Sequence, residues 1–133
     1  MCRGEGVSLL AYSPLAGGVL SGKYQGGAWP EGARFTRYRD GSPRTQSMTR
    51  RFVSERSLAA TARFAEVAKE HGLALPTFAV AWTLAHDFLG ATIVGATSVA
   101  QLEETLAAAE VPVPPEALAA VDRISKEIRH PMG

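Results

Sequence analysis

Two short segments combine small, polar and basic residues in an order that suits the binding of an anion. The first, Tyr-Ser-Pro-Leu-Ala-Gly-Gly at 12–18, follows an apolar stretch and is followed by Lys23. Glycines at the end of a strand let the backbone approach a phosphate closely, and a nearby lysine supplies positive charge. The segment therefore indicates either a phosphate-binding turn or a plain tight turn followed by a solvated lysine.

The second segment runs from Gly95 through Ala-Thr-Ser to an expected helix start. Ser98 and Gln101 have the spacing of a capping box, which places free N–H groups and the positive end of a helix after a strand. Gln101, Glu104 and Thr105 lie at i, i+3 and i+4 and share one helix face. The face suits one polar ligand, and the alternative is an ordinary solvated surface.

The strongest charge bias of the chain lies between residues 34 and 51. Six arginines (34, 37, 39, 44, 50 and 51) face a single acid, Asp40, so the local charge is six minus one, or +5. A phosphorylated ligand would suit this segment, whereas no base-stacking pattern favours nucleic acid. Several glycines and prolines and the lack of a sustained period predict a long mobile loop over 25–49.

Residues that could catalyse a reaction or hold a metal are sparse. The three histidines fall at expected helix ends, and the single Cys2 forms neither an internal disulfide nor a multi-cysteine metal site. We predict no catalytic residue and no metal ligand in this chain. The net charge of +1 and the absence of a long apolar run argue against nucleic-acid and membrane partners. One cysteine favours a reducing, cytoplasmic location.

Hydrophobic patterning predicts an α/β chain. Short apolar runs indicate buried strands at 7–12 and 91–95, and periodic segments indicate four helices, at 55–71, 76–86, 99–110 and from 115 onward. Two buried strands that are separated by helices must be parallel, and parallel pairs normally belong to a larger covered sheet. We therefore expect these 133 residues to form part of a larger α/β architecture.

The order of the motifs resembles the aldo-keto reductases. The similar segments are 11–24 (AYSPLAGGVLSGKY), 79–82 (AVAW) and 93–97 (IVGAT) with 101–104 (QLEE), and the resemblance is strongest to the bacterial-type and potassium-channel β-subunit-like branches. The resemblance implies that residues 1–133 are the C-terminal, cofactor-binding part of a (β/α)8 TIM barrel. Residues 7–12 would be strand seven and 91–95 strand eight.

The same resemblance implies a site for a nicotinamide dinucleotide, NADPH or alternatively NADH. Tyr12 would lie near the nicotinamide, although the channel-like branch often has Trp there. The other expected contacts are Ser13, Pro14, Leu15, Ala16, Gly17 and Lys23 at the pyrophosphate, Arg34 in a strap over the cofactor, and Gly95, Thr97, Gln101, Glu104 and Thr105 at the adenosine and its 2′-phosphate end. Thr105 stands where the family often has Asn, and Thr97 where Ser or Arg is common.

In this family a Tyr, supported by Lys, Asp and His, protonates the carbonyl oxygen during hydride transfer, and these residues come from the N-terminal half of the barrel. The resemblance thus implies that this chain lacks them and is inactive alone, with a small carbonyl substrate bound only by an intact barrel. Two alternatives stay open. One is a non-catalytic nucleotide-binding or interaction module that a partner chain completes. The other is an unrelated phosphate-binding α/β protein.

Overall fold

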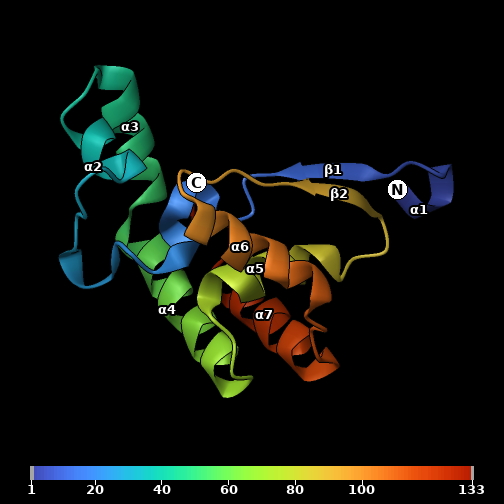
Figure 1. The fold of residues 1–133 in the computed structure, drawn as a ribbon. Coiled ribbons are helices and arrows are strands. Elements are labelled where there is room, and N and C mark those ends of the chain that lie inside the picture. The colour runs from blue at the N-terminus through green and yellow to red at the C-terminus, as the bar shows by residue number, and fades with distance from the viewer. Residues whose placement is uncertain (1, 133) are drawn as a thin grey trace.

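A computed structural model describes residues 2–132, which form a mixed α/β chain that is mostly helical (Figure 1). The predicted two strands and four helices occur in the predicted order, with further helices before the first strand and within the expected long loop. The helices and strands, with η marking 3₁₀ turns, are α1 (Cys2–Glu5), β1 (Leu9–Tyr12), η1 (Ala16–Ser21), η2 (Gln25–Gly27), α2 (Arg34–Arg39), α3 (Pro43–Phe52), α4 (Glu55–Glu70), α5 (Leu75–Leu84), β2 (Leu89–Ile93), α6 (Val99–Ala107), η3 (Ala108–Glu110) and α7 (Pro115–Glu127).

The two strands pair in parallel, as predicted. Leu10 lies opposite Ala91 and Tyr12 opposite Ile93, with an irregularity in the register between Leu9 and Leu10. Within residues 2–132 the sheet has only these two strands, so each strand has one open edge. Figure 1 shows the pair projecting away from the helices, with α1 at its far end.

The prediction that both strands are buried is wrong for these residues. Side chains such as Leu10 and Ile93 are more than half exposed. Parallel strands become buried when neighbouring strands flank them and helices cover both faces, and here each strand has one neighbour. The bounds also differ, since β1 begins later than residue 7 and β2 lies two residues before the expected 91–95.

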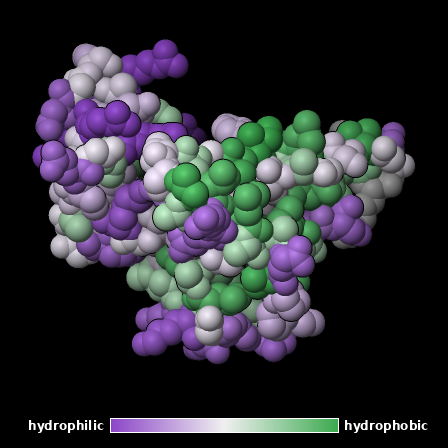
Figure 2. All heavy atoms as spheres, in the orientation of Figure 1, coloured by the Kyte–Doolittle hydropathy of each residue, from purple (hydrophilic) through white to green (hydrophobic). Residues whose placement is uncertain are grey.

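Apolar residues gather on the surface over the strands and α6, whereas the end formed by α2 and α3 is mostly hydrophilic (Figure 2). The largest exposed side chains on the apolar part are Val7, Leu9, Leu10, Tyr12, Ile93, Val99, Leu102 and Leu106. An exposed apolar area with open strand edges is typical of a surface that another element covers.

The four predicted helices are present as α4, α5, α6 with η3, and α7. A capping box begins α4, because Ser54 Oγ accepts a hydrogen bond from the N–H of Ser57 and Ser57 Oγ accepts one from the N–H of Ser54. Gly72 has a φ of +68° just after its end, as expected of an αL cap.

Helix α5 is the central element of the helical layer. Residues 77–81 are all buried, which confirms the expected packing on more than one side. Phe78 packs with Val67 of α4 and Val121 of α7, whereas Val80 belongs to a second cluster with Ala108.

The second half of the loop expected over 25–49 is helical, which corrects that prediction. Ser42 caps α3 by accepting a hydrogen bond from the N–H of Thr45, and Pro43 occupies the first turn. Phe35 and Phe52 stack with their ring centroids 5.2 Å apart and so join α2 to α3. Local caps and aromatic packing therefore order a segment whose sequence shows no clear hydrophobic period.

The segment packs on an aromatic cluster formed by Tyr24, Trp29, Phe35, Tyr38 and Phe52. Phe35 is fully buried and Tyr24 is 1% exposed. The cluster continues into Ala16 and Val19 of η1. The chain from η1 to α3 thus has a core of its own beside the helical layer.

An exposed ion pair between Arg63 of α4 and Glu127 of α7 generates a pH prediction. The hydrogen bond from Arg63, together with its charge, lowers the pKa of Glu127. The pair's stabilisation is therefore present above the pKa of Glu127 in the unfolded chain, and it is lost as the pH falls through the lower, folded value. Carboxyl NMR titration should show this lowered pKa. Arg63→Gln should raise it, and Lys69→Gln on the same helix should not.

Candidate functional site

The turn after β1 has a strained backbone. Ser13 and Ala16 have φ values of +59° and +50°, and Gly17 and Gly18 are also left-handed. Inside the turn, Ser13 Oγ accepts a hydrogen bond from the N–H of Gly17 at 3.2 Å, and Ser13 O accepts one from Ala16 at 2.9 Å. Left-handed conformations of non-glycine residues are costly and cluster at ligand-binding sites.

Gly17 is required by close packing as well as by its φ. A Cβ placed on Gly17 would lie 2.8 Å from Cζ of Phe35 and 3.6 Å from Nη1 of Arg34. Lys23 folds back over the same turn, because a Cβ on Gly18 would lie 3.3 Å from its Nζ. The turn therefore lies close to two of the predicted cations.

Tyr24 fixes the start of α2 and hence the position of Arg34. Ala33 is the N-cap of α2 and offers no side-chain acceptor. Instead, the buried hydroxyl oxygen of Tyr24 accepts a hydrogen bond from the N–H of Phe35 at 3.1 Å. A tertiary contact thus replaces a local cap.

A surface cavity of about 690 Å³ opens at this turn. Five of the predicted site residues line it: Tyr12, Ser13, Ala16, Gly17 and Arg34. Pro14, Leu15 and Lys23 are not among its lining residues. Helices α2 and α3 and the 132 position complete the wall, with lining residues Phe35, Arg44, Ser47, Met48, Arg51, Phe52 and Met132.

Sequence reasoning missed the contribution of α3. Positions 44, 47, 48 and 51 have the i, i+3, i+4, i+7 spacing of one helix face, and the arginine bias of 34–51 was visible. The assignment of 25–49 to a loop concealed that face. A second, smaller cavity of about 340 Å³ lies nearby, and it is lined by Arg50, Arg51, Ser54, Arg56, His130, Pro131 and Met132.

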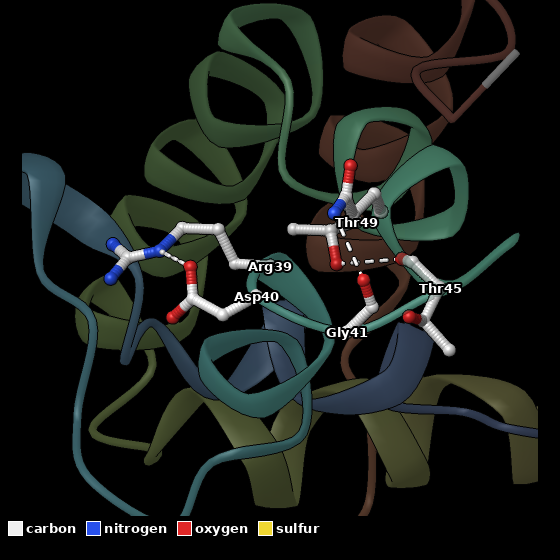
Figure 3. Close-up of polar contacts among 6 residues, drawn as sticks. Arg39, Asp40, Gly41, Thr45 and Thr49 are labelled. Carbon is white, nitrogen blue, oxygen red and sulfur yellow. Dashed lines mark hydrogen bonds and ion pairs between the residues drawn. The ribbon is translucent and has the colours of Figure 1, made fainter. Parts of the chain in front are cut away.

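Asp40, the single acid of the arginine-rich segment 34–51, lies on the turn between α2 and α3 and forms an ion pair there. Figure 3 shows Asp40 beside Arg39, whose Nε lies 3.5 Å from the Asp40 carboxylate. The same figure shows the hydroxyl of Thr49 donating to the carbonyl of Thr45, at 3.0 Å. Asp40 does not line the cavity, and its carboxylate forms an ion pair with Arg39.

The predicted residues of the second segment lie elsewhere. None of Gly95, Thr97, Gln101, Glu104 and Thr105 lines the cavity. The Oε1 atom of Gln101 accepts hydrogen bonds from both N–H and Oγ1 of Thr97, each at 3.0 Å. Half of the expected capping box therefore forms: Ser98 Oγ accepts from the N–H of Gln101, whose side chain serves Thr97 instead.

Thr105 does not share an open face with Gln101 and Glu104. Its side chain is 6% exposed, and its hydroxyl donates to the carbonyl of Gln101 at 2.7 Å. Glu104 is exposed, and its carbonyl accepts a hydrogen bond from Thr77 of α5. The three residues lie on one helix, but the structure does not bring them together around a common space.

Residues 2–132 contain no group of metal-ligating side chains that could hold an ion. In the same part of the chain, no helix has the length and apolar character needed to cross a membrane. The described site is a cavity lined by three arginines beside a strained strand end.

Comparison with known sequences decides the family, since a profile described as "Aldo/keto reductase family" matches residues 1–126. The chain belongs to the aldo/keto reductase family. It is 33% identical over 127 residues to protein tas of Escherichia coli and 32% identical over 107 residues to a probable voltage-gated potassium channel subunit beta of Arabidopsis thaliana. It is also 31% identical over 106 residues to L-glyceraldehyde 3-phosphate reductase of Escherichia coli.

These matches cover 96%, 80% and 80% of the aldo/keto reductase chain, but 34%, 31% and 30% of the three relatives. The chain therefore spans about a third of the length of the curated relatives it matches. The family resemblance drawn from the segments around Ser13 and Gly95 is confirmed.

Gly17 offers a test of how this aldo/keto reductase chain builds its strand-end turn. Gly17→Ala forces a Cβ against Phe35 at a positive φ, so we expect a loss of about 2–3 kcal/mol in the free energy of unfolding. Gly26→Ala is the matched control, because Gly26 has a φ of +64° with nothing within 4 Å of its Cβ position. Equal losses in urea denaturation would contradict the packing argument.

Tyr24→Phe tests the tertiary cap of α2. The substitution leaves the N–H of Phe35 buried without its acceptor, and such a loss costs about 1–3 kcal/mol. Tyr38→Phe, in the same aromatic cluster, serves as the control, since the structure gives the Tyr38 hydroxyl no hydrogen bond within residues 2–132. Thermal unfolding of both variants should separate them, and identical midpoints would contradict the cap.

Proposed function

We propose that the cavity after β1 binds the diphosphate and nicotinamide end of NADP(H), and that the chain is the cofactor-binding part of a carbonyl reductase. Members of the family generally use nicotinamide cofactors. The observation that carries the proposal is the meeting of Tyr12, Ser13, Ala16, Gly17 and Arg34 around one basic cavity.

The residues fit a diphosphate. Gly17 lines the cavity, and the absence of a side chain lets its backbone lie against Phe35 and close to Nη1 of Arg34, so the turn and the arginine border the same space. Arg34 and Lys23 supply two cations at the same turn, and an arginine binds phosphate oxygens in a bidentate manner. Pro14 and Leu15 hold the turn between Ser13 and Ala16. Tyr12 is 82% exposed and offers an aromatic face to the nicotinamide ring.

The proposed adenosine contacts are Gly95, Thr97, Gln101, Glu104 and Thr105, and they rest on the family resemblance. Four of them are exposed. The side chain of Gln101 would have to give up its hydrogen bonds from Thr97 to reach a ligand. Thr105 is buried, and its hydroxyl would position the helix backbone at Gln101 and not contact the ligand. NADPH is the proposed cofactor, with NADH as the alternative.

For the fold, we propose that β1 and β2 are strands seven and eight of a (β/α)8 barrel. The parallel pairing, the two open edges and the exposed apolar residues support this assignment. Residues outside this chain would complete the barrel, either in a longer chain or in a partner. We propose a cytoplasmic location, as the single cysteine favours.

When bound, the reduced nicotinamide supplies a hydride to the carbon of an aldehyde or ketone. This chain's part is to hold the diphosphate through Arg34, Lys23 and the 13–17 turn and to present Tyr12 at the ring. We assign no proton donor among these residues, so the chain alone should reduce a test aldehyde no faster than buffer with NADPH. A second candidate, a non-catalytic nucleotide-binding module completed by a partner, is favoured by the open strand edges.

Titration of the purified 133-residue chain with NADP+ and with NAD+ tests the site. Arg34→Gln should weaken binding about 10-fold to 100-fold, because a hydrogen bond to a charged group is worth about 1.5–3 kcal/mol. Arg37→Gln, on the same helix but outside the cavity lining, should leave the affinity unchanged. Equal effects of the two substitutions would overturn the assignment of Arg34.

A further inference from the structure

Helix α3 directs a polar face at the same cavity. Arg44, Ser47 and Arg51 all line the cavity, and they are spaced at i, i+3 and i+7 along the helix. This face is separate from the strand-end turn, and no residue of it belongs to the proposed diphosphate contacts. The cavity therefore has two polar walls, on two different elements.

The cavity carries more positive charge than a cofactor diphosphate needs. Arg34, Arg44 and Arg51 line it, and no carboxylate of the described residues does. The acid nearest in sequence to Arg44, Asp40, pairs with Arg39 on the turn between the helices. Unpaired arginines that converge on one cavity are typical of a phosphate or carboxylate site.

Arg44 occupies a position that does not favour helix stability. It lies in the first turn of α3, which contains no acidic residue, and the helix dipole is positive there. An exposed cation at this end is unfavourable for the helix. The positive end of the helix and the guanidinium instead add to the attraction that the cavity exerts on an anion.

Arg51, which lines both cavities, is held by two contacts that leave its terminal nitrogens without a hydrogen bond within residues 2–132. Its Nε donates to the carbonyl oxygen of Met132 at 2.7 Å, and its guanidinium lies 5.6 Å from the ring centre of Phe52. A guanidinium anchored at Nε keeps the N–H groups of its outer edge for a second acceptor. The side chain is thus partly pre-organised for binding.

We propose that Arg44, Ser47 and Arg51 form a second anion subsite, which binds a phosphate group other than the diphosphate at the strand-end turn. The inference rests on the proposed function only for where the cofactor lies. The source we assign is the phosphate of a small phosphorylated carbonyl compound that shares the cavity, because the 2′-phosphate of NADP(H) belongs with the proposed adenosine contacts, none of which lines this cavity. A cofactor that places its 2′-phosphate here is the other source, and the experiment distinguishes the two.

The experiment uses glycerol 3-phosphate as the probe, with glycerol as the uncharged control, in calorimetric titrations of the 133-residue chain with and without saturating NADP+. We expect glycerol 3-phosphate to bind and glycerol not to bind. Arg44→Gln should weaken that binding at least 10-fold, and Ser47→Ala should weaken it by a smaller factor. Arg50→Gln removes the same charge from the same helix but lies outside this cavity, so it should change nothing.

The arms of the experiment separate the two sources. If glycerol 3-phosphate still binds with NADP+ present, and Arg44→Gln weakens only glycerol 3-phosphate, the subsite serves a separate phosphorylated compound. If the two compete and Arg44→Gln weakens both, the subsite holds a phosphate of the cofactor. If Arg44→Gln and Arg50→Gln have equal effects, or glycerol 3-phosphate does not bind, the subsite is overturned. If the unsubstituted chain binds glycerol 3-phosphate but does not bind NADP+, the proposed cofactor site is refuted and the phosphate subsite stands.

Discussion

The buried ring of Phe35 is the contact on which the site depends. It lies against the bare backbone of Gly17, its N–H is held by Tyr24, and it stacks on Phe52. One side chain thereby joins the end of β1 to α2 and α3, the elements that carry the cavity's arginines. Because aromatic rings pack closely and bury a large apolar area, the distance between the turn and Arg34 is set by rigid contacts.

The molecule divides its stability between two cores of different character. Helices α4, α5 and α7 bury aliphatic side chains around Phe78, whereas the segment from η1 to α3 relies on aromatic rings around Phe35. The sheet contributes little to either core, since its side chains are largely exposed. The site is accordingly held by the aromatic cluster and by the backbone of the strand-end turn, not by a covered sheet.

Sequence reasoning predicted the features whose causes are local. The four helices from 55 onward have clear periodicity and end signals such as Gly72, and the parallel pairing follows from the order of strands and helices. It missed α2 and α3, because their order comes from Phe35 and Phe52 meeting Tyr24, a contact that spacing does not reveal. It also missed that Thr105 faces inward and that Arg44 and Arg51 face the cavity. Five residues predicted for the site do line the cavity, since a glycine-rich turn and a basic residue are visible without a fold, but their role as cofactor contacts stays a prediction.

The hydrogen bond from Arg51 to Met132 joins residues 81 positions apart, and it does so at the wall of the cavity. Any ligand that draws on the Arg51 guanidinium is therefore in thermodynamic linkage with the docking of the 130–132 segment. The coupling is reciprocal: if binding of a ligand in the cavity stabilises the docked 130–132 segment, docking of that segment strengthens ligand binding by the same free energy. A probe placed in the 130–132 segment would therefore respond to occupancy of the cavity.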